Sequence, residues 1–217
     1  MIIKDILKET INKILILSIA IVAVFLSYYL VSKNNNKLPQ KPIVFLSSNN
    51  IWVMNSDGTD KKQLTDTGYD TTPSFNSNES KIVFSRKGEI LTMDSSGNDQ
   101  IVLVNNDEYS NGFPAWSPNG SKIVYVAAKS IKLMSYNEWQ PIPYEIWIMD
   151  SDGNNKKKIF EDLKDKKDLS WNPDGSKISF KASIKEITQP EMYDLPYELW
   201  EINTDGSGLK QLTKFEE

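Results

Sequence analysis

One motif recurs along this chain, and the recurrence constrains the fold more than any other feature of the sequence. In the best-preserved copy, residues 113–160, the string FPAWSPNGSKIVYV is followed by a connection and then by YEIWIMDSDGNNKKKIF. Related strings stand at residues 43–65, 72–85, 89–104, 168–180 and 198–213. Periodic self-similarity of this kind predicts a fold made of small units that stack on one another.

Each unit has the composition of four short antiparallel strands, which we term a, b, c and d. In residues 113–160 these are FPAWS, KIVYV, EIWIMD and KKKIF, rich in the β-branched and aromatic residues of strands. Between strands c and d each copy has an Asp-Gly or Ser-Gly pair, where Gly accepts the positive φ of a tight reversal. The pairs are Asp57-Gly58, Ser96-Gly97, Asp152-Gly153 and Asp205-Gly206.

Strands b and c are mostly continuous apolar runs, which predicts that both faces of each small sheet are covered. Radial stacking of sheets provides that coverage, so we predict an all-β fold, a β-propeller of about four blades, incomplete or small. Aligned on strand c, the copies begin at Ile51, Ile90, Ile146 and Leu199, at spacings of 39, 56 and 53 residues. The first spacing fits a bare blade of about 40 to 45 residues, and the others require insertions.

These strings resemble the TolB-type propeller repeat, also described as the WD40-like or PD40 repeat. The resemblance is carried by PAWSPNGSKI at residues 114–123, by the near match at 170–178, and by strings such as IWIMDSDG beginning at Ile51, Ile146 and Leu199. It extends over nearly everything after the N-terminal segment. The second copy departs from the pattern, with Phe75 and Leu91 where other copies have Trp.

Residues 14–31 are predicted to form one transmembrane helix ahead of the propeller. They are 18 consecutive uncharged positions, and a helix of that length spans about 27 Å, close to the thickness of the bilayer's hydrocarbon core. A cleaved signal peptide, the alternative, would have a shorter apolar core and small residues at its cleavage site.

The anchor sets the expected localisation. We expect residues 1–13 to be a short cytoplasmic tail and residues 32–42 a linker, in a single-pass protein of the cell membrane. Lys residues flank the span on both sides, so the positive-inside rule discriminates weakly. The short tail and the family resemblance favour a propeller outside the cytoplasm, extracellular or periplasmic.

Charge and composition exclude several function classes. After residue 37 the chain holds 20 Lys and Arg against 27 Asp and Glu, a net charge of about −7, which argues against nucleic-acid binding. The chain has no His and no Cys, which excludes Ser-His-Asp and Cys-His catalysis and His- or thiolate-ligated metals. We therefore predict a protein that is not an enzyme and has no catalytic residue, metal site or cofactor.

Two kinds of chemistry remain as alternatives. A carbohydrate-binding or carboxylate-dependent carbohydrate-cleaving module of the envelope is conceivable, but on the innermost strands we expect only one acidic residue, Asp168. The Asp-x-Asp-Gly string at Asp150 resembles part of a calcium loop, but a calcium loop needs further ligands beyond the turn. The recurring Trp residues indicate packing between blades: Trp52, Trp116, Trp147, Trp171 and Trp200.

Two long b-to-c connections, residues 128–144 and 182–197, are the predicted binding elements. In a propeller the b-to-c and d-to-a loops share one face, and loops on a rigid scaffold commonly carry binding function. These connections are more aromatic than solvated loops require, as interface cores are. We predict a protein or peptide partner bound through Tyr109, Met134, Tyr136, Trp139, Ile142, Tyr144, Met192, Tyr193 and Tyr197, unless these side chains fold over their own blades.

The count of strands leaves the closure of the propeller open. The repeats fall at about residues 43–66, 72–105, 113–161 and 168–214, within a domain of residues 43–217, and strand a is missing from the first. Three architectures fit: a small ring with an imperfect seam, an open arc, or a subunit that completes its ring with another chain. Exposed strand edges pair readily, so self-association through open blade edges is expected. A truncated propeller without activity of its own is a further alternative.

Overall fold

The computed structural model describes residues 25–27, 41–105, 109–129, 144–162, 164–183 and 196–214. It divides into two units, Met1–Lys41 and Pro42–Glu217. The transmembrane helix predicted at residues 14–31 lies outside the described residues except for a helical turn at residues 25–27. Within the described part of the chain, no helix has the length and apolar character needed to cross a membrane.

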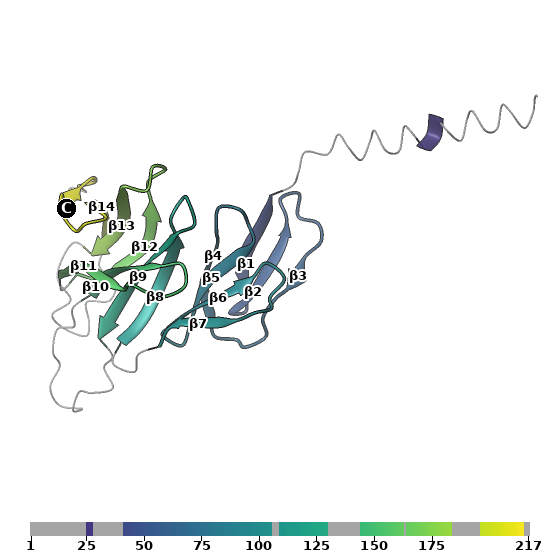
Figure 1. Ribbon diagram of the computed structural model, residues 1–217, viewed down its shortest axis with the longest axis horizontal. Helices are drawn as coiled ribbons and strands as arrows, with labels where there is room; N and C mark the ends of the chain where they lie inside the picture. Colours follow the sequence, from purple (N-terminus) through teal and green to yellow (C-terminus); the bar gives the residue numbers. More distant parts are fainter. Residues whose placement is uncertain are drawn as a thin grey trace, which may run out of the picture. The chain divides into compact units, whose positions relative to one another are not determined.

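The second unit consists of four antiparallel sheets, A to D, each built from consecutive strands (Figure 1). Sheet A contains β1 (Pro42–Ser47), β2 (Asn50–Asn55) and β3 (Lys62–Gln63), and sheet B contains β4 (Asp70–Phe75), β5 (Lys81–Arg86), β6 (Glu89–Asp94) and β7 (Ile101–Val104). Sheet C contains β8 (Tyr109–Trp116), β9 (Lys122–Lys129), β10 (Tyr144–Asp150) and β11 (Lys157–Asp162). Sheet D contains β12 (Lys166–Trp171), β13 (Lys177–Ser183), β14 (Tyr197–Asn203) and β15 (Lys210–Gln211). The predicted all-β fold with four repeats is confirmed, as is the missing strand a of the first repeat.

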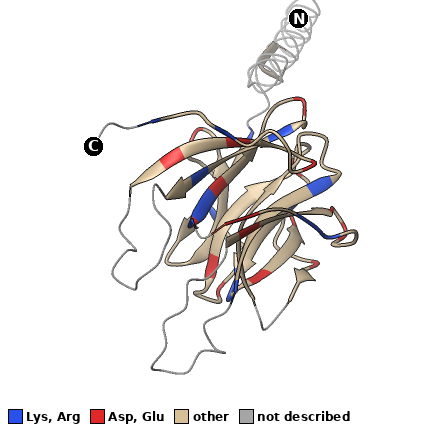
Figure 2. Cartoon of the chain, turned by 90° about the vertical axis from the view of Figure 1, so that its left-hand side faces the viewer, with Lys and Arg blue, Asp and Glu red and all other residues tan. Residues whose placement is uncertain are grey.

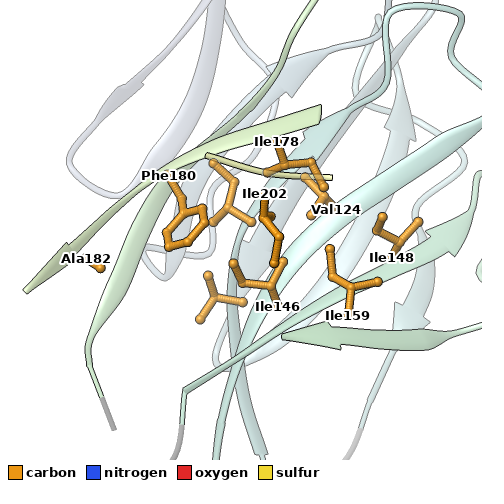
Figure 3. Close-up of a cluster of buried hydrophobic side chains, with 10 residues drawn as sticks. Val124, Ile146, Ile148, Ile159, Ile178, Phe180, Ala182 and Ile202 are labelled. Atoms are coloured by element: carbon orange, nitrogen blue, oxygen red, sulfur yellow. The ribbon is translucent and has the colours of Figure 1, made fainter. Parts of the chain in front are cut away.

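Each pair of neighbouring sheets encloses one hydrophobic cluster. Between sheets C and D, Val124, Ile146 and Ile148 pack against Ile178, Phe180 and Ile202 (Figure 3). The B–C and A–B junctions hold equivalent clusters, centred on Val83 with Met149 and on Ile51 with Phe84. Full burial of one such side chain contributes about 1.5–3 kcal/mol, so the stability of each sheet depends on its neighbours.

The Trp residues predicted to pack between blades do so in sheets C and D. Trp116 is buried in the B–C cluster and Trp147 packs against it, while Trp171 and Trp200 pack against the C–D cluster. Trp52 of sheet A differs, because it pairs with Phe45 on the face of sheet A that has no sheet before it. For Trp52 the prediction of packing between blades is therefore wrong in this structure.

The innermost strands share a feature that the sequence did not reveal. Strands β4, β8 and β12 each contain a register shift, at which Thr72, Phe113 and Asp168 adopt positive φ values of 48°, 53° and 55°. A bulge of this kind bends a strand and increases its twist. Beyond the bulge the strands continue, so β4 starts at Asp70, which is fully buried and is bound by Arg86 at 2.6 Å. The expectation that Asp168 would be the only acidic residue on an innermost strand was therefore wrong.

The four sheets pack in chain order and do not close into a ring. Strands of sheet B contact both A and C, and strands of sheet C contact both B and D. Among the described strands, no extended contact joins sheet A to sheet D. Of the three architectures that the repeat count allowed, the closed small ring disagrees with these described strands, whereas the open arc and the subunit that completes its ring with another chain both agree with them.

The turns between strands c and d link each sheet to the one before it. A Cβ at Gly97 would lie 2.9 Å from the carbonyl oxygen of Leu64 in the preceding sheet, and at Gly153 it would lie 3.2 Å from that of Leu103. At Gly206 the Cβ would overlap the carbonyl oxygen of Ile159. Gly58 of the first sheet meets nothing within 4 Å. The glycines thus serve both the turn and the approach of neighbouring sheets.

Gly206→Ala and Gly58→Ala form a matched pair that separates these two roles. Both residues have positive φ, +95° and +82°, so Ala costs about 1–2 kcal/mol at either site through backbone strain. Only at Gly206 must the preceding sheet also move, which adds about 1–3 kcal/mol. Urea unfolding should therefore show the larger loss of stability for Gly206→Ala. Equal losses would mean that the close approach to Ile159 does not contribute.

Candidate partner-binding face

The predicted binding residues that the structure describes lie at one end of sheets C and D, here called the loop end. Tyr109 pairs with Lys129 at the start of β8, and Tyr144 pairs with Ala128 at the start of β10. Tyr197 pairs with Ser183 at the start of β14. Both long connections leave and rejoin the sheets at this end, as predicted. Met134, Tyr136, Trp139, Ile142, Met192 and Tyr193 lie outside the described residues.

Tyr144 and Tyr197 both contact residues 165–167 at the start of β12. The Tyr197 hydroxyl donates a hydrogen bond to Asp165, and the ammonium group of Lys167 lies 3.5 Å from the centre of the Tyr197 ring. The backbone carbonyl of Tyr144 accepts a hydrogen bond of 3.0 Å from Lys166. Burial and the bond to Asp165 both raise the pKa of Tyr197. Residues 165–167 therefore hold both tyrosines in place, Tyr144 on β10 and Tyr197 on β14.

Lys166 is the buried centre of this arrangement. Its side chain is fully inaccessible to solvent, and its ammonium group also donates to Asp162 and to the carbonyl of Lys164. Burial lowers the pKa of Lys166, and the hydrogen bond to Asp162 opposes that effect. A buried ammonium is tolerated only when its donors are paired, as they are here.

Tyr109 lies at a different junction, on a groove between sheets B and C. The groove has a volume of about 360 Å³ and is lined by Leu103, Val104, Asn105, Tyr109, Asn111, Tyr125, Ala127, Trp147 and Lys156. Tyr125 and Trp147 stack with their ring centres 6.4 Å apart. The groove thus combines the half-buried rings of Tyr109 and Trp147 with the exposed amide group of Asn105, a mixture typical of binding sites, whereas the buried Asn111 amide already donates to the carbonyl of Gly88 at 2.8 Å.

Glu145 holds Trp147, one of the aromatic side chains that line the groove, in its orientation. The indole N–H of Trp147 donates to Glu145 at 2.6 Å, and Lys158 approaches the same carboxylate at 3.1 Å. Burial, followed by the charge of Glu145, raises the pKa of Tyr125, which therefore stays a neutral phenol. Glu145 itself is 3% exposed and is not among the residues lining the groove. Its role in this structure is to orient Trp147.

The opposite end of the sheets has a hollow of a different kind. It measures about 380 Å³ and is formed largely by the a-to-b turns around Pro118 and Pro173. Its hydroxyl, amide and carboxylate groups are engaged in those turns. Asp174, for example, accepts from Ser176, and these hydrogen bonds lower the pKa of Asp174. Across the described residues, no group of acidic side chains is arranged to hold a metal ion.

Known proteins resemble these repeats in sequence and in fold. No protein-family model matches the chain. The Tol-Pal system protein TolB of Anaeromyxobacter dehalogenans (strain 2CP-C) is 26% identical over 175 residues, covering 75% of this chain and 35% of that protein. TolB from Acinetobacter baumannii superposes with a TM-score of 0.56 at 19% identity, over 76% of this chain and 37% of that one. The repeats are similar in sequence to those of TolB and share the β-propeller fold of TolB proteins.

The same fold is shared with proteins of other kinds. Oligogalacturonate lyase from Vibrio parahaemolyticus superposes with a TM-score of 0.57 at 14% identity, covering 77% of this chain and 46% of that one. A chain of a nidogen/laminin complex gives 0.59 at 12% identity, covering 78% and 60%. At these identities the likeness concerns the fold alone. The chain spans about a third of the length of the TolB proteins and half that of the others.

Sequence reasoning missed several residues of the loop end. Asp70, Asn111 and Lys166 occupy one position, five residues before Phe75, Trp116 and Trp171, and all three are buried. Aligning the repeats on that aromatic residue would have revealed the shared position, although three different side chains occupy it. Tyr69, 57% exposed beside Lys87, was also missed because it lies in a short loop.

Lys166→Met tests whether the buried ammonium governs stability in mild alkali. Because the folded-state pKa is lowered, the unfolded chain binds the proton more readily below its ordinary pKa of about 10.5, and unfolding free energy rises with pH there. The tyrosines with raised pKa act in the opposite sense only near pH 10 and above. Urea unfolding between about pH 8 and 9.5 should show a positive slope in the wild type and a smaller one in Lys166→Met. An unchanged slope would assign the effect to another group.

Proposed function

We propose that this protein is a non-enzymatic binding module that captures a protein or peptide segment at the loop end of its TolB-type repeats. The observation that carries this proposal is the groove beside Tyr109, where the half-buried ring of Trp147, stacked on Tyr125, lies together with the exposed amide of Asn105. Aromatic surfaces supply most of the energy of protein interfaces, and amides can pair with a bound backbone. The TolB and nidogen/laminin chains that share the fold support a propeller that binds proteins.

The composition of the groove favours binding over hydrolysis. Carbohydrate cleavage by carboxylates needs two of them about 5 to 10 Å apart across the scissile bond. The described residues that line the groove include no Asp or Glu, and nearby Glu145 is occupied by Trp147 and Lys158. The likeness to oligogalacturonate lyase keeps an envelope carbohydrate ligand as the second candidate.

Replacement of Tyr109 provides the direct test. The purified protein is screened on a peptide array and a glycan array, and the best ligand is titrated against wild type, Tyr109→Ala and Tyr69→Ala. We expect a peptide ligand, and a loss of affinity of about 30-fold for Tyr109→Ala, the effect of removing a central aromatic contact worth about 2 kcal/mol. Tyr69→Ala is the control, because Tyr69 is exposed at the same end but does not line the groove.

Two results would contradict the proposal. Binding to glycans without binding to peptides would favour the carbohydrate alternative. Equal effects of Tyr109→Ala and Tyr69→Ala, with unchanged circular dichroism, would place the binding surface elsewhere. Trp139→Ala and Tyr193→Ala then show whether the two long connections contribute to the same capture.

We further propose that residues 14–31 anchor the module in the cell membrane and that the propeller is displayed outside the cytoplasm. The support is the sequence alone, 18 consecutive uncharged residues followed by a polar stretch with two prolines.

Membrane extraction tests the anchor. The full chain should stay in the membrane pellet after alkaline carbonate treatment, whereas a chain lacking residues 14–31 should be released into the supernatant. Protease added to intact cells or spheroplasts should digest the propeller if it is displayed outside. Release of the full chain by carbonate, or protection from protease, would overturn the anchor or its orientation respectively.

A further inference from the structure

The outward face of sheet A is the uncovered counterpart of faces that are buried elsewhere in the molecule. The register of β1 and β2 places Ile43, Phe45, Trp52 and Met54 on that face, while Val44, Ile51 and Val53 pack on sheet B. The matching positions in sheet D are Ile178, Phe180, Trp200 and Ile202. Ile178 is fully buried against sheet C, whereas Ile43 is 39% exposed. Among the described residues, no sheet lies over this face of sheet A.

The c-to-d turn of sheet A, at Gly58, provides a second observation about the same docking face. In the other three sheets the turn glycine lies against a carbonyl oxygen of the preceding sheet's last strand. Gly58 has the same positive φ but nothing within 4 Å. No described strand therefore takes, at sheet A, the place that the preceding sheet has beside the other three turn glycines. This observation is independent of the apolar face beside it.

The junctions inside the molecule show what chemistry fits such a face. In sheet D, Phe180 and Trp200 pack against a sheet C face that carries Val124, Val126, Ile146 and Ile148. In sheet C, Tyr125 and Trp147 pack with Val83 and Ile90 of sheet B. Both junctions place an aromatic-bearing face on a branched-aliphatic one. A second copy of the face with Phe45 and Trp52 would place aromatic on aromatic and would leave both Gly58 turns uncovered.

The outward face of sheet D, the last sheet, is not a branched-aliphatic face of this kind. Its outward face carries Ser179, Lys181, Leu199 and Glu201, where sheet C has Val124, Val126, Ile146 and Ile148. Lys181 pairs with Asp168 at 2.8 Å and Glu201 with Lys177 at 2.6 Å, both in contact with solvent. Figure 2 shows both charge signs along the strands. Burying these charges costs several kcal/mol, which disfavours head-to-tail assembly of identical chains.

We propose that the outward face of sheet A docks an uncharged, branched-aliphatic sheet face of a partner protein, with a backbone carbonyl of that sheet's edge strand seated over Gly58. The partner face has the character that sheet C offers to sheet D. This surface is distinct from the groove beside Tyr109, and its test does not depend on the proposed function.

A variant of this chain can present the proposed partner face on its own sheet D. The triple variant Ser179→Val, Lys181→Val, Glu201→Ile gives sheet D the residues that sheet C has at these positions. We expect the full-length wild type in detergent to remain monomeric in sedimentation velocity. The triple variant should associate head to tail, with a dissociation constant at least tenfold lower. The double variant Lys181→Val, Glu201→Ile removes only the charges and gives the same readout if the triple variant folds poorly.

A substitution at Gly58 distinguishes specific docking of the two sheet faces from nonspecific hydrophobic association. Gly58→Asn adds a side chain where the docking strand would lie, and Asn tolerates positive φ, so the fold is retained. Added to the triple or double variant, it should restore the monomer. The proposal would be overturned if the triple and double variants remained monomeric. It would also be overturned if their association persisted after Gly58→Asn was added. A wild type that dimerises would also overturn it, because an identical chain would then be the preferred occupant.

Discussion

Packing of branched aliphatic side chains against aromatic ones, sheet on sheet, is the interaction on which this structure depends. No sheet has an interior of its own, since each is one strand layer thick with apolar residues on both faces. Val124 and Ile146 are buried only because Phe180 and Ile202 lie over them. Stability is therefore divided among the junctions, as in other repeat proteins. The turns and bulges can be understood as devices that bring these faces into contact.

Much of this architecture was predictable because it rests on local patterns that repeat. The Asp-Gly turns at Gly153 and Gly206, the four sheets and the missing first strand follow from turn chemistry and from counting copies. The common end of Tyr144 and Tyr197 follows from meander topology. Each of these inferences needed only neighbours within one repeat.

The remaining features arise from contacts between repeats or from backbone states that no residue type marks. Thr72, Phe113 and Asp168 share a positive φ although they share no chemistry. The burial of Lys166 depends on the carbonyls of Tyr144 and Lys164, and the groove depends on Tyr109 and Trp147 of sheet C meeting Leu103 of sheet B across a junction. The charges on the last sheet were visible in the sequence, but their meaning required the register that sets Lys181 opposite Leu199.

The direction of the glycine contacts has a consequence for how the protein is made. Every c-to-d turn glycine that touches another sheet touches the one before it in the chain, as Gly97 touches Leu64 and Gly206 touches Ile159, whereas Gly88 in the b-to-c turn of sheet B touches Ser110 of the sheet that follows. Because the ribosome releases the chain from its N-terminus, the preceding sheet has already emerged when each new c-to-d turn is synthesised. The c-to-d turns can dock stepwise behind translation, whereas the contact of Gly88 with Ser110 and the burial of Val124 and Ile146 are completed only when the next sheet has been synthesised.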